Sequence, residues 1–171
     1  MRTRLQILLV GSILLGTLLT AWWLHSPLYH EVRAVTSFTV INAPADKVLG
    51  VLTDFKKYPE WNPYIVEAVP RADQPAELGI VERTGNRSRS HTVQLTRFDM
   101  NGFAWSGSTT PGWLLSWNES FTVTEIDATH CRLEVSQSYQ GALLRSYWNY
   151  YNQKTLSAVK SMGLAVKKRV E

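Results

Sequence analysis

The C-terminal segment of the chain constrains the fold most strongly. Residues 142–169 contain no proline, and their apolar side chains recur three or four positions apart, which is typical of one amphipathic helix. This apolar stripe comprises Leu144, Tyr147, Trp148, Tyr151, Thr155, Val159, Met162, Val166 and Val170. A helix of this length must bury its stripe against another layer of structure. The rest of the chain must therefore supply a large apolar face.

A sheet of about seven strands is the predicted partner of this helix. Residues 34–41 alternate and are rich in β-branched side chains, which predicts the first strand. The same period of two predicts strands near 64–70, 77–84, 89–98, 102–108, 114–126 and 130–139, separated by turn signals. Consecutive hairpins imply an antiparallel sheet. The economical α+β arrangement is a strongly curved sheet wrapped around the C-terminal helix, with a hollow between them.

An aromatic stretch interrupts this pattern after the first strand. A helix is predicted for about 44–54, followed by the sequence DFKKYPEWNPYI at 54–65, in which two prolines forbid a continuous helix. The stretch therefore predicts a short helical pair that ends at Asn62 and Pro63, because a residue before proline avoids the α region. We expect Phe55, Tyr58 and Trp61 to close the mouth of the hollow. The alternative is that Trp61 belongs to the core.

The N-terminal segment has a different composition. Residues 5–24 carry no charge, and about 20 apolar residues suffice to cross the hydrocarbon core of a bilayer. We interpret residues 1–24 as a transmembrane anchor, 25–33 as a linker and 34–171 as the folded domain. Two arginines before the span predict a single-pass protein with a cytoplasmic N-terminus and an extracytoplasmic domain, periplasmic in a Gram-negative bacterium. A cleaved signal peptide is the alternative interpretation.

Charge and motif content narrow the function classes. The net charge is +4, but Arg2 and Arg4 precede the apolar span, and the rest of the chain carries 16 basic against 14 acidic residues. Such a balance does not favour a nucleic-acid partner. Cys131 is alone, the four histidines are scattered, and no nucleophile, phosphate-loop or dinucleotide motif occurs. We therefore expect no metal and no cofactor.

The alternation of side chains along the strands predicts which polar groups point to the interior. In the strand near 114–126, Glu119 shares a face with Trp117, Phe121 and Val123. By the same rule His91 and Arg97 share a face of one strand, and Tyr139 points to the same side as Cys131 in another. A buried carboxyl group has a raised pKa unless it is paired, which suits acid or base chemistry. Glu119 is thus the candidate catalytic residue, and His91 or Arg97 would be its partner.

One stretch resembles a known family. The sequence INAPADKVLGVLTDFKKYPEWNPYI, followed by FAWSGS, SFTVTEID and the final helix, looks like the polyketide cyclase/dehydrase-type branch of the START-like (SRPBCC, helix-grip) superfamily. The resemblance covers nearly all of residues 35–171. It implies a seven-stranded sheet around a deep cavity for hydrophobic molecules. It does not imply one reaction, because this fold hosts carriers, cyclases and hydrolases.

These observations predict a membrane-tethered binding or carrier domain. Its ligand would be a hydrophobic small molecule, such as a lipid, a quinone or a polycyclic or aromatic compound. The alternatives are a polyketide cyclase/dehydrase-like enzyme and a structural or interaction domain whose own side chains fill the cavity. The predicted ligand-binding residues are Phe55, Tyr58, Trp61, His91, Arg97, Trp105, Trp117, Glu119, Tyr139 and Trp148.

Overall fold

The computed structural model describes residues 2–24 and 31–171. Helix α1 spans Arg2–Leu24, and β1 begins the domain at Val32–Ile41. The remaining elements are α2 (Ala45–Thr53), η2 (Phe55–Lys57), α3 (Tyr58–Trp61), β2 (Ile65–Pro70), β3 (Glu77–Thr84), β4 (Arg87–Asp99), β5 (Gly102–Ser108), β6 (Ser116–Asp127), β7 (His130–Gln140) and α4 (Leu144–Val170).

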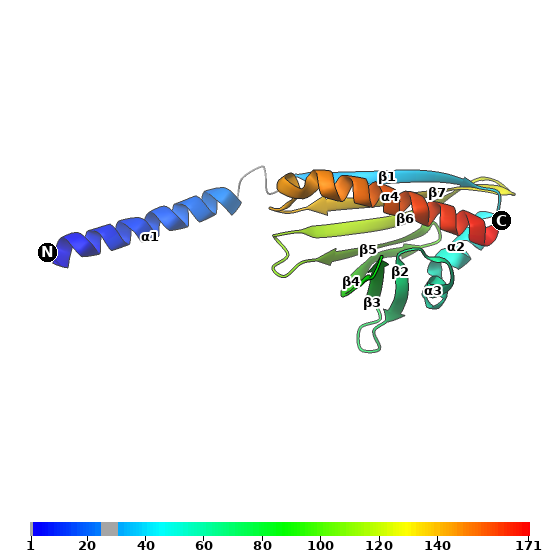
Figure 1. The fold of residues 1–171 in the computed structure, drawn as a ribbon, viewed down its shortest axis with the longest axis horizontal. Helices are drawn as coiled ribbons and strands as arrows, with labels where there is room; N and C mark the ends of the chain where they lie inside the picture. Colours follow the sequence, from blue (N-terminus) through cyan, green and yellow to red (C-terminus); the bar gives the residue numbers. More distant parts are fainter. Residues whose placement is uncertain (1, 25–30) are drawn as a thin grey trace.

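Seven strands form one antiparallel sheet in the order β1-β7-β6-β5-β4-β3-β2. Helix α4 runs along one face of this sheet, and α2 and α3 lie near its C-terminal end (Figure 1). This arrangement confirms the predicted α+β helix-grip fold. The predicted strand and helix order is also confirmed, including the short helical pair between the first two strands.

Some boundaries differ from the prediction. Strand β1 starts at Val32, two residues before the predicted start, so the last part of the predicted linker belongs to the sheet. The rest of that linker, residues 25–30, lies outside the described residues. Strand β6 starts at Ser116 rather than 114, because the backbone N–H of Leu114 donates to the carbonyl of Pro111 and keeps the chain in a turn.

The core lies between the sheet and the C-terminal half of α4. Alternate residues of the strands point to this face, and the most buried large side chains include Ile41, Leu78, Phe103, Trp105, Phe121, Leu133 and Val135. From α4 they meet Val159, Met162, Val166 and Val170, which recur at helical spacing. Between residues 145 and 154, α4 has no fully buried side chain. The helix is therefore loosely packed between residues 145 and 154, although Leu144 at its first residue is buried against Leu115 and Tyr139.

The aromatic stretch belongs to the core. Tyr58 is fully buried, and its hydroxyl group donates to the carbonyl of Leu52 at 2.7 Å. Phe55 and Trp61 pack edge-on against Tyr58, with ring centroids 5.5 and 4.9 Å away. None of these three residues lines either of the two hollows described below. Their rings pack α2 and α3 onto β5, as the alternative of a core position for Trp61 expects, and the closing of a mouth by these residues stays a prediction.

The turn after α3 is confirmed in atomic detail. The side-chain carbonyl of Asn62 accepts hydrogen bonds from the backbone N–H groups of Tyr64 and Ile65, both at 2.9 Å. Its amide group donates to the sulfur of Met162 on α4 at 3.3 Å. Asn62 thus ends the helical pair, starts β2 and ties both to the C-terminal helix.

Helix α1 confirms the helix expected over residues 5–24. Its described apolar side chains, including Leu9, Ile13, Leu14, Leu18 and Trp22, are exposed. Within the described part of the chain, no helix combines the length and the apolar character needed to cross a membrane. The structure therefore gives no support to the prediction that this helix is a transmembrane anchor.

Two helical glycines allow a matched test of the α4 contact. A Cβ atom at Gly163 would overlap the hydroxyl oxygen of Thr39 on β1, whereas a Cβ atom at Gly50 in α2 would meet nothing within 4 Å. Gly163→Ala should lower the free energy of unfolding by about 1–3 kcal/mol through overpacking. Gly50→Ala should raise it by about 0.5–1 kcal/mol through helix propensity. Chemical denaturation measures both, and an equal gain in the two variants would contradict the close contact.

Candidate functional site

A hollow of about 440 Å³ lies between the sheet and the N-terminal half of α4. The α4 residues that line it lie between 151 and 158, so it overlaps the end of the segment 145–154 that has no fully buried side chain. Its walls are Tyr64, Glu82, Arg89, His91, Thr109, Leu115, Trp117, Gln137, Tyr139, Tyr151, Lys154, Thr155, Ser157 and Ala158. The hollow therefore combines aromatic and aliphatic surface with hydroxyl, amide and charged groups. We call it the inner hollow.

Tyr139 and α4 form one wall of the inner hollow. The hydroxyl groups of Tyr139 on β7 and Thr155 on α4 are hydrogen-bonded at 2.8 Å, and the rings of Tyr139 and Tyr151 lie 5.4 Å apart. Burial raises the pKa of Tyr139 to about 12, so its phenol stays neutral at physiological pH. This wall offers an aromatic surface with a neutral hydroxyl pair.

Trp117 forms the wall on the sheet side. Its ring lies directly against Gly107 of β5, where any side chain would overlap the indole. The His91 ring meets it edge-on at 5.6 Å, and the guanidinium carbon of Arg89 lies 5.9 Å from its centroid. Gly107 is thus required for the position of Trp117, since only glycine leaves room for the indole beside β5.

His91 is neutral at physiological pH. Burial is the main cause that lowers its pKa, while the Glu82 carboxylate, 4.0 Å from His91 Nε2, acts in the opposite direction and Arg89 in the same one. The Nδ1 atom of His91 is buried and has no hydrogen-bond partner among the described residues. Neutral imidazole avoids the cost of placing a second cation beside Arg89.

Glu119 is half-buried and is not among the residues that line the inner hollow. As predicted from strand parity, it points inward, where the indole N–H of Trp105 donates to its carboxyl oxygen at 2.9 Å. Burial is the main cause that raises the pKa of Glu119 to about 7, against the lowering effect of the Trp105 hydrogen bond. Its surroundings favour the neutral acid, and no basic side chain forms an ion pair with it among the described residues.

Arg97 does not reach the interior. A β-bulge shifts the register of β4 against β5 between Leu95 and Arg97, so one extra residue turns the arginine to the opposite face. There its guanidinium donates to the hydroxyl of Thr122 at 2.9 Å and lies 3.4 Å from the carboxylate of Asp99. The predicted pairing of Glu119 with His91 or Arg97 is therefore wrong.

Three of the ten predicted ligand-binding residues line the inner hollow: His91, Trp117 and Tyr139. Trp105 is fully buried in the core, and Trp148 is half-buried beside the guanidinium group of Arg33, whose central carbon lies 5.4 Å from the indole. Phe55, Tyr58, Trp61 and Glu119 also lie in or next to the core, and Arg97 lies outside it. Ligand contact by any of them stays a prediction. Among the described residues, no group of acidic, histidine or cysteine side chains could hold a metal ion.

Most polar residues that line the inner hollow are absent from the residues predicted from the sequence. Arg89 shares its strand parity with His91, so the rule that nominated His91 could also have found Arg89. Glu82 is the cross-strand partner of Arg89, which becomes visible only when the β3–β4 register is known. Lys154 and Ala158 are four residues apart on α4, on the side of Tyr151, but an isolated lysine in a helix normally points to water.

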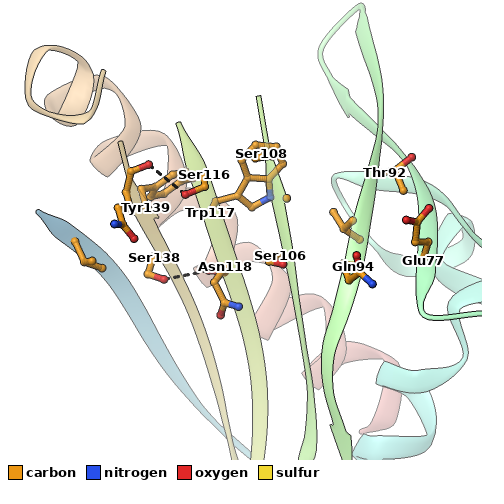
Figure 2. Close-up of a pocket in the computed structure, with 14 residues that line it drawn as sticks. Glu77, Thr92, Gln94, Ser106, Ser108, Ser116, Trp117, Asn118, Ser138 and Tyr139 are labelled. Atoms are coloured by element: carbon orange, nitrogen blue, oxygen red, sulfur yellow. Dashed lines mark hydrogen bonds between the residues drawn. The ribbon is translucent and has the colours of Figure 1, made fainter. Parts of the chain in front are cut away.

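A second hollow lies on the opposite face of the sheet from α4. Its volume is about 510 Å³, and Figure 2 shows its walls, which are mainly serine, threonine, asparagine and glutamine side chains of β4 to β7. The hydroxyl groups of Ser116 and Ser138 donate to the carbonyls of Gln140 and Asn118 at 3.4 and 3.5 Å. This outer hollow opens where the β4–β5 pairing ends at Gln94 and Ser106. Val32 and Val93 are its aliphatic residues, and it lacks the cationic groups of the inner hollow, although Trp117 and Tyr139 border both.

Comparison with known families gives a match over most of the domain. The model of a family described as "Polyketide cyclase / dehydrase and lipid transport" matches residues 32–161. That range begins at the first residue of β1 and ends within α4, so it includes every strand. A search of curated protein sequences gives no significant match.

Solved structures share the fold at low sequence identity. A START superfamily protein from Mycobacterium smegmatis is 17% identical with a TM-score of 0.67, over 80% of this chain and 96% of that one. A norcoclaurine synthase point mutant from Thalictrum flavum is 13% identical with a TM-score of 0.64, over 82% and 95%. The Zhui aromatase/cyclase from Streptomyces is also 13% identical, with a TM-score of 0.62 over 82% and 97%. These likenesses establish the fold and leave the chemistry of this chain open.

The raised pKa of Glu119 predicts how stability depends on pH. Folding raises this pKa from 4.5 to about 7, so the wild-type protein loses stability as the pH rises through this window. Glu119→Gln should therefore be more stable than wild type at about pH 8, by about 1–3 kcal/mol. The glutamine carbonyl can still accept the hydrogen bond of Trp105, and the gain should shrink towards pH 4.5. Thermal melts at the two pH values measure the difference.

Glu125→Gln is the matched control, because Glu125 is exposed on the same strand. It should change little at either pH. A Glu119→Gln protein that is less stable than wild type at pH 8 would mean that a cation pairs with the carboxylate.

Proposed function

This chain belongs to the polyketide cyclase/dehydrase and lipid transport family, and we propose that it binds a hydrophobic small molecule in the inner hollow. The family lies within the START/SRPBCC superfamily, whose helix-grip fold places a sheet around a helix. Candidate ligands remain those named from the sequence: a lipid, a quinone, or a polycyclic or aromatic compound.

The composition of the inner hollow is the observation that carries this proposal. Small-molecule sites are concave, have volumes of about 300–1,000 Å³, and combine apolar walls with a few convergent polar groups. The inner hollow has a volume of about 440 Å³ and offers the rings of Trp117, Tyr139 and Tyr151 and the side chains of Leu115 and Ala158. Its size also argues against the alternative of a domain whose own side chains fill the cavity.

An enzyme of the cyclase type is the second candidate. The observation in its favour is a pair of neutral titratable groups, the phenol of Tyr139 and the imidazole of His91, on the walls of the same hollow. Glu119, the predicted catalytic residue, lies outside these walls. Binding is therefore the function that the geometry supports better.

Membrane attachment is a separate proposal, which rests on the uncharged run of residues 5–24. Exposed apolar side chains on a helix are costly in water and favourable in lipid. The described leucines of α1 are exposed in this way. Attachment would keep the inner hollow close to the phase in which an apolar ligand dissolves.

Filling the inner hollow should abolish binding. Ala158→Phe places a ring in the hollow from α4, while Leu164→Phe adds a ring to an exposed position of the same helix. We expect the purified full chain and Leu164→Phe to bind the neutral fluorescent probe N-phenyl-1-naphthylamine. The affinity of Ala158→Phe should fall by at least tenfold, because the probe and the new ring compete for one volume. Fluorescence titration measures the three proteins.

Native mass spectrometry of the wild-type chain gives an independent readout, since an apolar ligand that co-purifies adds mass. Equal probe affinities of Ala158→Phe and the wild type would contradict binding in the inner hollow.

The position of the domain relative to the membrane can be tested in cells. The positive charges before residues 5–24 predict that protease added to Gram-negative spheroplasts producing the full chain digests the domain. Immunoblotting after carbonate extraction shows whether the chain stays with the membrane fraction. Protection of the domain in sealed spheroplasts, with digestion after lysis, would overturn the predicted orientation.

A further inference from the structure

Two cationic side chains stand at the border of the inner hollow. Arg89 comes from β4 and Lys154 from α4, so they lie on opposite walls, and both are exposed. In the part of the chain that the structure describes, neither has a carboxylate within 4.0 Å. Arg89 lies over the ring of Trp117 and Lys154 over the ring of Tyr150, at 5.9 and 5.8 Å. Two cations without ion-pair partners thus face an aromatic hollow.

The other titratable groups of these walls neutralise this charge only in part. Glu82 is the one carboxylate among the residues that line the hollow, and it lies opposite Arg89 in the β3–β4 register. His91, 4.0 Å from Glu82, is neutral at physiological pH because burial lowers its pKa. The Tyr139 hydroxyl is neutral, because burial raises its pKa to about 12. Two cations against one carboxylate leave the walls with an excess of positive charge.

We propose that the ligand is an amphiphile with one acidic group, held so that its anion lies between Arg89 and Lys154 and its apolar body lies against Trp117, Leu115 and Ala158. This inference rests on the proposed binding function and names the class of ligand. It goes beyond the fold, which is shared by proteins of different chemistry.

The exposure of the two cations supports this orientation. A carboxylate that stays at a water-accessible border keeps much of its hydration, whereas a buried one would lose it at high cost. The guanidinium of Arg89 can bind a carboxylate through two parallel N–H donors, and Lys154 adds a flexible point charge. The apolar body of the ligand displaces water from the aromatic wall. This burial contributes equally to the affinity of charged and neutral ligands. The anion therefore decides between ligands of equal apolar size.

Two probes of nearly the same shape test the proposal. 2-Naphthoate carries the anion, and 2-naphthalenemethanol replaces it by a neutral hydroxyl group. Their affinities for the full chain are measured at pH 7.5 by displacement of N-phenyl-1-naphthylamine. We expect 2-naphthoate to bind about tenfold more tightly, and this preference should weaken as salt is raised, because the cations are exposed.

Removal of the two charges should abolish the preference. In the double variant Arg89→Gln/Lys154→Gln the affinity ratio of the two probes should fall to about one, with binding of the alcohol unchanged. Lys154→Gln alone changes an exposed helix position and should give a ratio between those of the wild type and the double variant. The matched control Arg87→Gln/Lys160→Gln removes exposed charges from the same strand and helix outside the hollow and should keep the wild-type ratio.

The outcomes separate this inference from the proposed function. Equal binding of both probes to the wild type would overturn the acidic ligand and leave binding intact, as would an unchanged preference in the double variant. Displacement by neither probe, together with no binding of N-phenyl-1-naphthylamine, would overturn the proposed binding function itself.

Discussion

The contact between β1 and the C-terminal half of α4 is the constraint on which the rest of the structure depends. Gly163 lets the helix approach Thr39 more closely than any other residue would allow. Two lysines then fix the same end, since Lys167 donates to the carbonyl of Val40 and Lys47 to the carbonyl of Val170, at 2.9 and 2.6 Å. Towards the other end, α4 has no fully buried side chain between residues 145 and 154, and residues 151–158 of the helix contribute to the walls of the inner hollow.

Trp117 lies between the inner and the outer hollow. It lies against Gly107 at the place where β4 and β5 separate, and it borders both hollows. On the outer side it meets hydroxyl and amide groups, which water solvates well. On the inner side it meets the ring of His91 and lines the inner hollow together with residues of α4. The Trp117 indole therefore separates the two hollows and supplies the apolar wall of the inner hollow, on which the proposed ligand binding depends.

The titratable groups near the inner hollow have two different environments. Glu119 is half-buried and points inward, and its surroundings favour the neutral acid, because the hydrogen bond from Trp105 does not compensate for lost hydration. Arg89 and Lys154, by contrast, are exposed to water. The raised pKa of Glu119 affects the stability of the domain. The exposed cations at the border of the inner hollow affect which ligand binds. This difference is why we assign recognition to the arginine and the lysine rather than to Glu119.

The sequence by itself determined the order of strands and helices, the antiparallel sheet and the inward direction of Glu119, because periods of two and of three to four residues are local properties of the backbone. It also identified His91, Trp117 and Tyr139. Only the tertiary structure decided where Arg97 points, since one extra residue in a bulge reverses strand parity. It likewise decided that Phe55, Tyr58 and Trp61 pack in or against the core and that Lys154 faces a hollow. Those outcomes depend on how α4 lies on the sheet, and residues distant in the chain set that position through close packing.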